Sequence, residues 1–208
     1  MPNWCSNVVE VQHEDPALIT AIADAMRDGK FLNHVIPVPQ ELQETMAGSY
    51  GDAEKQAALE AQTARNIEKY GAGNWYDFCV SHWGTKWDVD CQSVEVSDDG
   101  KMVTASFDSA WSPPIGIYEK LNEDGFYVRA YYYESGMCFA GIYENGCDDC
   151  YSDWGDAQGA KDTLPQDLDD TFAISESQAE WEAENAEEEE LTEWIKDGAE
   201  KRSELKVL

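Results

Sequence analysis

Tryptophan and lysine side chains suited to binding a ligand are concentrated in the string WGTKWD, residues 83–88. An indole offers a broad apolar face and one N–H donor, and an ammonium group beside it attracts an anion. Trp83, Lys86 and Trp87 therefore predict the edge of a ligand-binding pocket. The alternative is structural: the aromatic residues hold this loop against a sheet, and Lys86 forms an ion pair.

A second aromatic group follows residues 126–134, where side chains alternate between two faces of a predicted strand. Tyr127, Arg129, Tyr131 and Tyr133 share one face, and the apolar residues share the other. Tyrosines on an open sheet can stack nucleic-acid bases, as in RNA-recognition folds. A small ligand and packing within the protein are the other two interpretations.

The sequence predicts no catalytic residue. Cys79 and His82 would be neighbours on a helix, but no third group follows that would orient them as nucleophile and base. The G-x-S-x-G, Walker and HExxH motifs do not occur. We therefore expect a protein that binds rather than an enzyme, with no cofactor.

Six cysteines occur in the chain, and three of them lie close together in sequence. Cys147 and Cys150 have the spacing of metal ligands, with Cys138 upstream. A second pair of ligands does not follow, so these three are weak zinc candidates. Buried or turn cysteines are the favoured interpretation, and no metal is predicted.

Acidic residues dominate the chain, with 43 Asp and Glu against 14 Lys and Arg and a net charge of −29. Residues 1–147 carry −14 and residues 148–208 carry −15. This balance opposes direct nucleic-acid binding, which needs clustered cations. It favours a partner protein with a basic surface.

The end of the chain predicts an acidic helix that begins near Ser175. Such a helix could imitate the charge of a nucleic acid, and tryptophans could anchor it on a partner. A solvated, solubilising tail is the alternative. The candidate partner-binding residues are Trp181, Glu187, Glu188, Glu189, Glu190 and Trp194.

The N-terminus and the hydropathy of the chain predict a cytoplasmic protein. MPNWCSN has neither the basic start nor the apolar stretch of a signal peptide. No run of apolar residues is long enough to span a bilayer. We therefore expect no membrane partner.

The periodicity of the chain predicts alternating strands and helices. We expect a strand over 3–12, a helix from Pro16 carrying Leu18, Ile19, Ile22 and Met26, and an extended segment over 31–42. One or two inserted helices should occupy about 41–70. A strand hairpin, a second helix and two strands, 126–134 and 137–144, complete the series, and Ser135-Gly136 makes the last turn.

The predicted order is β-α-β-β-α-β with an extra strand and the helical insertion. This order predicts an α+β fold with a ferredoxin-like (split βαβ) antiparallel sheet, one face of which two helices cover. We expect one domain over residues 1–154. Residues 155–208 should form an acidic linker and the acidic C-terminal helix.

Four segments together carry a resemblance to a known family: MPNWCSN, VIPVP, WYDFCVSHWGTKWD and AWSPP. The sequence resembles the YubB-type family of ferredoxin-like proteins of bacteriophages and conjugative plasmids, over roughly residues 1–145. The family's function is unknown, so the resemblance implies no catalytic residues. It implies a ferredoxin-like fold, a mobile-element origin and a bacterial host cell.

Charge and resemblance together predict a non-enzymatic phage or plasmid protein that binds a basic host protein. The concrete form of this hypothesis is an acidic inhibitor of a host defence protein or of a nucleic-acid-binding protein. The alternative is a module that binds a nucleotide-like small ligand, through the tyrosine face or the WGTKWD loop.

Overall fold

The computed structural model describes residues 3–49 and 51–188 of the 208-residue chain. They form a mixed α+β structure of two compact units, the first ending at Ser152 and the second beginning at Asp153. The first unit contains β1 (Trp4–Gln12), α1 (Pro16–Arg27), α2 (Phe31–Val35), α3 (Gln40–Gln43), α4 (Ala53–Tyr70), α5 (Trp75–His82), β2 (Cys91–Val96), β3 (Met102–Ala110), α6 (Ile115–Glu123), β4 (Tyr127–Glu134), β5 (Phe139–Glu144) and β6 (Cys147–Ser152).

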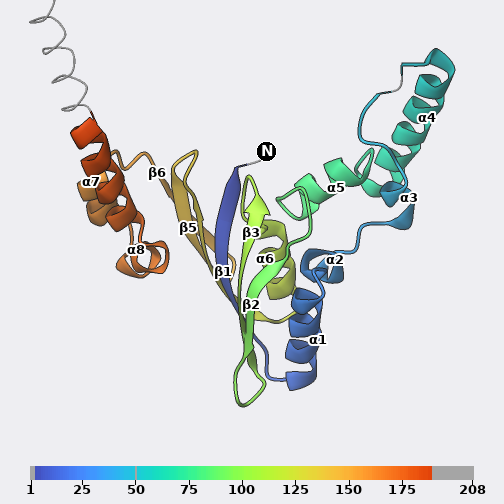
Figure 1. The fold of residues 1–208 in the computed structure, drawn as a ribbon. Helices are drawn as coiled ribbons and strands as arrows, with labels where there is room; N and C mark the ends of the chain where they lie inside the picture. Colours follow the sequence, from blue (N-terminus) through green and yellow to red (C-terminus); the bar gives the residue numbers. More distant parts are fainter. Residues whose placement is uncertain (1–2, 50, 189–208) are drawn as a thin grey trace, which may run out of the picture. The chain divides into compact units, whose positions relative to one another are not determined.

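The six strands form one antiparallel sheet in the order β2-β3-β1-β4-β5-β6 (Figure 1). Strand β1 lies between β3 and β4, so the N-terminal strand is central. The predicted mixed α+β class with an antiparallel sheet is confirmed.

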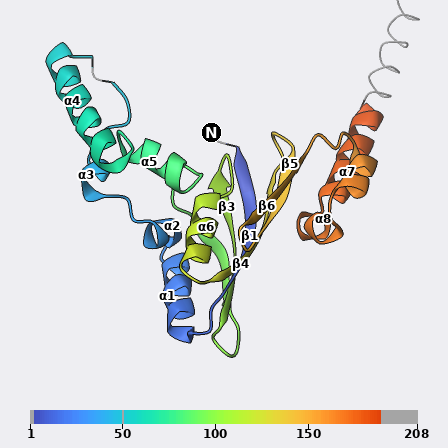
Figure 2. The same ribbon diagram turned by 180° about the vertical axis from the view of Figure 1, so that it is seen from behind.

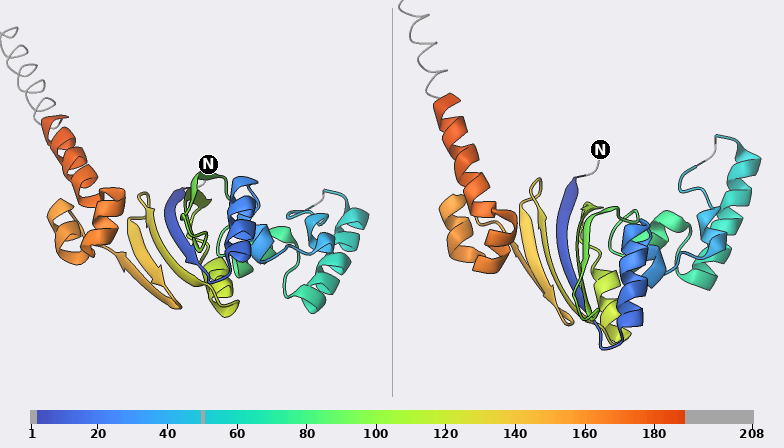
Figure 3. Two further views of the ribbon diagram at one scale, coloured as in Figure 1. Left: turned by 90° about the horizontal axis from the view of Figure 1, so that it is seen from below. Right: turned by 60° about the horizontal axis from the view of Figure 1, so that its bottom comes forward.

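Helices α1 and α6 lie on the same face of the sheet (Figures 2 and 3). The side chains that alternate toward them, including Val9 and Val11 of β1 and Phe107 of β3, are almost fully buried. Ile19 of α1 and Ile117 of α6 pack into the same hydrophobic core. This core holds the sheet on which the candidate site is built.

Local sequence signals account for helix α1. The Asp15 side chain accepts a hydrogen bond from the Ala17 N–H at 2.9 Å, and Pro16 occupies the first turn, where it needs no hydrogen-bond acceptor. Ile19 and Met26 are buried as their spacing predicts, whereas Leu18 is exposed. The apolar stripe is therefore narrower than the sequence suggested.

The segment after α1 is helical where we predicted an extended chain. Residues Phe31–Val35 form α2, and only the part around the two prolines is extended. The helix is stabilised from a distance, because the Asp88 carboxylate accepts hydrogen bonds from the N–H groups of Leu32 and Asn33. A cap supplied 55 residues away is not visible in the local sequence.

The helical insertion consists of α3 and α4, followed by α5. Asp52 caps the N-terminus of α4, and Gly71 ends it in the left-handed conformation at φ 72°. Helix α5 begins after Asn74, whose side chain accepts a hydrogen bond from the Asp77 N–H. The insertion thus delivers Trp75 and the WGTKWD loop to the end of the sheet.

The turn between β4 and β5 is longer than the predicted two-residue turn at Ser135-Gly136. Four residues, 135–138, connect the strands, and the Glu134 carboxylate accepts hydrogen bonds from the N–H groups of Gly136 and Met137. Strand β5 therefore begins at Phe139 rather than at Met137. Strand β6, which has no apolar alternation, was not predicted.

The second unit is already helical at Ala157, in the stretch where we predicted a linker before a helix near Ser175. It contains α7 (Ala157–Thr163), α8 (Gln166–Phe172) and a further helix over 174–188. The Trp154 indole N–H donates to Gln178 at 2.9 Å, and Leu168 and Ile174 are buried. Asp156 and Pro165 occupy the N-cap positions of α7 and α8, where we predicted turn-forming residues of a linker.

Candidate functional site

The WGTKWD loop is fixed by hydrogen bonds to the segment that ends β3 and follows it, residues 110–112. Thr85 donates from its hydroxyl to the Ala110 carbonyl at 2.9 Å, and the Ser112 hydroxyl donates to the Gly84 carbonyl. Gly84 has φ 89°, and the carbonyl oxygen of Pro113 would lie 3.0 Å from a Cβ at this position. A glycine is therefore required where the loop passes over the start of α6.

Trp83 belongs to the interior. Its side chain is 4% exposed, and its indole N–H donates to the Ile36 carbonyl at 2.9 Å. The indole therefore has its polar atom satisfied and presents only apolar surface to a neighbouring cavity. Trp83 therefore has both predicted roles: it packs in the interior, and one surface of its indole forms part of a cavity wall.

Asp88 at the end of the loop is a half-buried carboxylate bound to backbone donors. It accepts hydrogen bonds from the N–H groups of Leu32 at 2.8 Å, Asn33 at 3.0 Å and Val89 at 3.0 Å. Burial raises the pKa of Asp88 above its usual value, although these three hydrogen bonds lower it. Asp88 thus couples the loop to α2 and contributes a polar group to the cavity between them.

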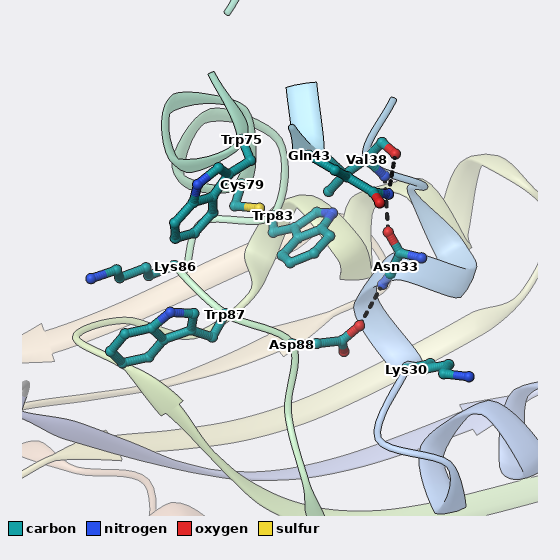
Figure 4. A pocket seen from close by; sticks show the side chains of 10 residues that line it. All are labelled: Lys30, Asn33, Val38, Gln43, Trp75, Cys79, Trp83, Lys86, Trp87 and Asp88. Carbon is teal, nitrogen blue, oxygen red and sulfur yellow. Dashed lines mark hydrogen bonds between the residues drawn. The ribbon is translucent and has the colours of Figure 1, made fainter. Parts of the chain in front are cut away.

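A cavity of about 430 Å³ lies between the loop and helices α2, α3 and α5 (Figure 4). Its apolar lining comes mainly from Trp75, Trp83 and Trp87, with Val38 and Cys79. Its polar lining consists of Lys30, Asn33, Gln43, Lys86 and Asp88. The sequence predicted Trp83, Lys86 and Trp87 at a pocket edge, and the structure places all three in one cavity lining.

Lys86 lies among aromatic rings rather than beside a carboxylate. Its ammonium nitrogen is 4.2 Å from the ring centroid of Trp87, 5.5 Å from that of Trp111 and 5.6 Å from that of Tyr76. It forms no ion pair within residues 3–49 and 51–188. The ion pair that we considered for Lys86 is therefore not formed with any described residue.

Three partly exposed tryptophans lie side by side next to Lys86. Ring centroids are 6.4 Å apart between Trp4 and Trp87 and again between Trp87 and Trp111. Their exposed fractions are 50%, 40% and 41%. We call Trp4, Trp87 and Trp111 the tryptophan surface. Indoles exposed together in this way are typical of binding surfaces rather than of random positions.

An acidic groove of about 490 Å³ adjoins the tryptophan surface. Trp4 and Trp87 line it together with Asp88, Asp90 and Asp108. Asp108 accepts hydrogen bonds from Ser6 and Gln92, whereas Asp90 is exposed and is bonded to no side chain in the described part of the chain. The groove combines apolar faces with a negative charge.

The four segments MPNWCSN, VIPVP, WYDFCVSHWGTKWD and AWSPP converge on this region. MPNWCSN supplies Trp4, the WGTKWD loop supplies Trp87, and AWSPP supplies Trp111. VIPVP supplies the Ile36 carbonyl that binds the indole of Trp83. Sequence reasoning did not select Trp4, Trp75 or Trp111 as site residues. The tryptophans in the quoted segments were the available signal for them.

The tyrosine face of β4 is engaged within the protein. Tyr127, Arg129, Tyr131 and Tyr133 are all partly buried on the face opposite α1 and α6. The Arg129 guanidinium lies 5.1 Å from the Tyr131 ring centroid and 3.9 Å from Glu144, and the Tyr127 hydroxyl donates to Glu144. The Arg129 guanidinium thus covers one face of the Tyr131 ring, whereas Tyr127 contacts Glu144 through its hydroxyl.

The structure describes only some of the candidate partner-binding residues of the acidic helix. Trp181, Glu187 and Glu188 lie on the helix over 174–188, and Trp181 is 63% exposed. Glu189, Glu190 and Trp194 lie outside the described residues. The structure places Trp181 at a surface.

Cys79 and His82 do not form a nucleophile and base. Burial, with a smaller contribution from Asp88, raises the pKa of the Cys79 thiol to about 12, so the thiol stays protonated at neutral pH. His82 stacks on Phe78 at 4.0 Å between ring centroids, and its Nδ1 is shared with Ser81 and the Phe78 carbonyl. The two side chains serve packing and local hydrogen bonding.

The weak zinc candidates do not converge. Cys147 and Cys150 are exposed on strand β6, where residues three apart point to opposite faces, and Cys138 occupies a turn at φ 58°. Over residues 3–49 and 51–188, no three His, Cys, Asp or Glu side chains are grouped as metal ligands. In the same ranges, no helix is long and apolar enough to cross a bilayer.

Comparisons with known proteins give one distant structural likeness. No family model and no curated protein matches this sequence. The crystal structure of protein api92 from Yersinia pseudotuberculosis, of the family DUF1281, is similar with a TM-score of 0.34 and 13% identity. The match covers 74% of this chain and 98% of that chain.

Proposed function

We propose that this chain is a non-enzymatic, cytoplasmic phage or plasmid protein of the YubB type that binds a basic host protein. A ferredoxin-like (split βαβ) fold is part of the proposal. The strand order β2-β3-β1-β4, with α1 joining β1 to β2 and α6 joining β3 to β4, supports it. Strands β5 and β6 then extend the sheet beyond the ferredoxin-like part.

The observation that carries the binding proposal is the tryptophan surface beside the acidic groove. Indoles dominate binding energy at protein interfaces, because they bury a large area at a small cost in side-chain entropy. Trp4 and Trp87 line the groove with Asp88, Asp90 and Asp108. Such a groove complements an arginine or lysine side chain that is set in an apolar surface.

The net charge of −29 adds long-range attraction to this local complementarity. An acidic protein approaches a basic surface faster at low ionic strength, and salt screens the attraction. Nucleic-acid-binding proteins carry such basic surfaces. The concrete form of the proposal is inhibition of a host defence nuclease or of another nucleic-acid-binding protein, with the acidic helix adding charge.

Affinity capture from bacterial lysate tests the proposal in the full chain. A basic protein should be retained at low salt and released at high salt. Trp4→Ala and Trp111→Ala should each weaken binding of the captured protein about thirtyfold, as expected for interface hot spots. Leu18→Ala is the matched control, because Leu18 is also an exposed apolar side chain but does not line the groove, and it should change the affinity little.

Two results would contradict the proposal. Failure to retain any basic protein at low salt removes its electrostatic basis. If Trp181→Ala abolishes binding while Trp4→Ala and Trp111→Ala do not, the tryptophan surface is not the interface, and the acidic helix carries the interaction instead.

A further inference from the structure

We infer that the cavity between the WGTKWD loop and helices α2, α3 and α5 binds a planar aromatic anion of the nucleoside monophosphate class. This inference is separate from the proposed protein interface, although Trp87 borders both sites. It rests on three features of the cavity: its aromatic walls, its cations and its hydrogen-bonding groups.

The walls suit a flat ring. Trp75, Trp83 and Trp87 contribute their indoles to a cavity of about 430 Å³, a volume typical of small-molecule sites. The N–H of Trp83 is already bonded to Ile36, so this indole has apolar contact to offer. A base or another planar ring can lie against these indoles, and stacking on an aromatic side chain is favourable for any base.

The cations of the cavity lack carboxylate partners. Lys30 and Lys86 both line it, and neither forms an ion pair within the described ranges 3–49 and 51–188. Of the ten lysines and arginines in these ranges, Arg27, Lys69, Lys101, Lys120 and Arg129 lie within 4 Å of a carboxylate oxygen, whereas Lys55, Arg65 and Lys161, which do not line the cavity, form no ion pair either. In a chain with three acids for each base, two unpaired lysines at one cavity favour a negatively charged ligand.

The position of Lys86 indicates where the negative charge would lie. Figure 4 shows its side chain emerging between the indoles of Trp75 and Trp87 and pointing away from Trp83. A ring placed against the indoles would therefore carry its phosphate outward, at the mouth of the cavity. There the phosphate meets the ammonium group and remains partly hydrated.

Asp88 and Asn33 favour a ring that carries hydrogen-bonding groups. The two Asp88 oxygens share three backbone donors, which stabilise the carboxylate and leave Oδ2 able to accept another hydrogen bond. Asn33 accepts from Val38 through Oδ1, and its amide nitrogen has no acceptor among the described residues. A nucleobase offers both an N–H donor and an acceptor for these groups.

Titration with AMP, GMP, CMP and UMP, and with the four matching nucleosides, tests the inference. At least one monophosphate should change the tryptophan fluorescence and raise the melting temperature with concentration. Its nucleoside should bind about tenfold more weakly, because the contact between phosphate and lysine is missing.

Two variants separate the contribution of the Lys86 charge to ligand binding from that of the indole walls. Lys86→Gln should weaken the monophosphate about tenfold and leave the nucleoside unchanged, whereas Trp75→Leu should weaken both. Lys101→Gln is the control, since Lys101 is paired with Glu14 away from the cavity.

Two outcomes would overturn the inference. One is that none of the four monophosphates changes the fluorescence or the melting temperature at millimolar concentration. The other is that Lys86→Gln affects monophosphate and nucleoside alike, or affects neither. Because Trp111→Ala tests the protein interface and Trp75→Leu tests the cavity, failure of one proposal is distinguishable from failure of the other.

Discussion

The WGTKWD loop and strand β4 contain the same ingredients, one cation among several aromatic side chains. On β4, Arg129 lies over the ring of Tyr131 and pairs with Glu144, which also accepts a hydrogen bond from Tyr127. In the loop, Lys86 lies over the ring of Trp87 and has no carboxylate partner in the described part of the chain.

The difference lies in what surrounds each cation. Strand β4 has β5 as its neighbour, and the pairing sets Glu144 opposite Arg129. The loop leaves the end of the sheet, where a cavity and a groove adjoin it instead of another strand. Aromatic density thus indicates a possible binding site, and the neighbouring elements decide whether its polar groups stay available.

The largest expected effect separates the two roles within the loop. Trp83→Ala should lower the free energy of unfolding by about 3–5 kcal/mol, because it opens a cavity in the core and removes the hydrogen bond to Ile36. Trp87→Ala should cost only about 1 kcal/mol, since this side chain is 40% exposed. Urea denaturation measures both, and equal losses would show that Trp87 is also structural.

A smaller effect is expected at Asp88, which links the loop to α2. Asp88→Asn should cost about 1–2 kcal/mol, because an amide accepts fewer backbone hydrogen bonds than a carboxylate. Folding raises the pKa of Asp88, so the folded state binds the proton of this carboxyl more tightly than the unfolded state does. The contribution of Asp88 to the free energy of unfolding is therefore largest below the usual pKa of an aspartate, and it falls as the pH rises through the pKa of the folded state.

The stability deficit of Asp88→Asn should therefore be smallest at neutral pH and grow as the pH falls toward the usual pKa of an aspartate. Denaturation of both proteins across this pH range measures it, and the comparison removes the contribution of the other carboxylates. If the deficit shrinks on acidification, the hydrogen bonds to Asp88 lower its pKa by more than burial raises it.

Removing each cation tests the comparison directly. Arg129→Gln should cost about 1 kcal/mol, because Glu144 loses its ion pair and Tyr131 loses its cation–π contact. Lys86→Gln should cost about 0.5 kcal/mol, the contribution of a partly exposed cation–π contact. If Lys86→Gln is the more destabilising, the loop lysine is structural after all.

The smallest effect on stability is expected from modification of the thiols, whose reactivity distinguishes exposed cysteines on β6 from buried cysteines. Burial raises the pKa values of Cys5, Cys79 and Cys91 to about 12, so these thiols should resist iodoacetamide in the native protein. Cys147 and Cys150 are exposed on β6 and should react first, with almost no loss of stability. Mass spectrometry of the peptides, with unfolded protein as control, measures the order of reaction.

The sequence predicts those parts of the fold whose signals are local. Asp15-Pro16 marks the start of α1, and the alternation around Asp98-Asp99-Gly100 predicts the β2–β3 hairpin. Helix α2 could not be predicted, because Asp88 caps it from another part of the chain. Strand β6 carries charges instead of alternating apolar residues, and its pairing with β5 forms it.

The same distinction applies to the candidate site. The composition of residues 83–88 predicts a pocket edge, since tryptophan and lysine there stand out from the rest of the chain. Trp4 and Trp111 could not be assigned to the site, because only the pairing of β1 with β3 brings their segments together. Sequence reasoning also could not separate the buried Trp83 from the exposed Trp87.

The strand order has a consequence for self-association. Strands β2 and β6 are the two ends of the sheet, and each carries carboxylates: Glu95 on β2, and Asp148 and Asp149 on β6. Unpaired sheet edges are templates for amyloid-like pairing between molecules, and charges placed on them oppose it. Two copies meeting edge to edge would bring like charges together, so we expect these edges to oppose pairing between copies.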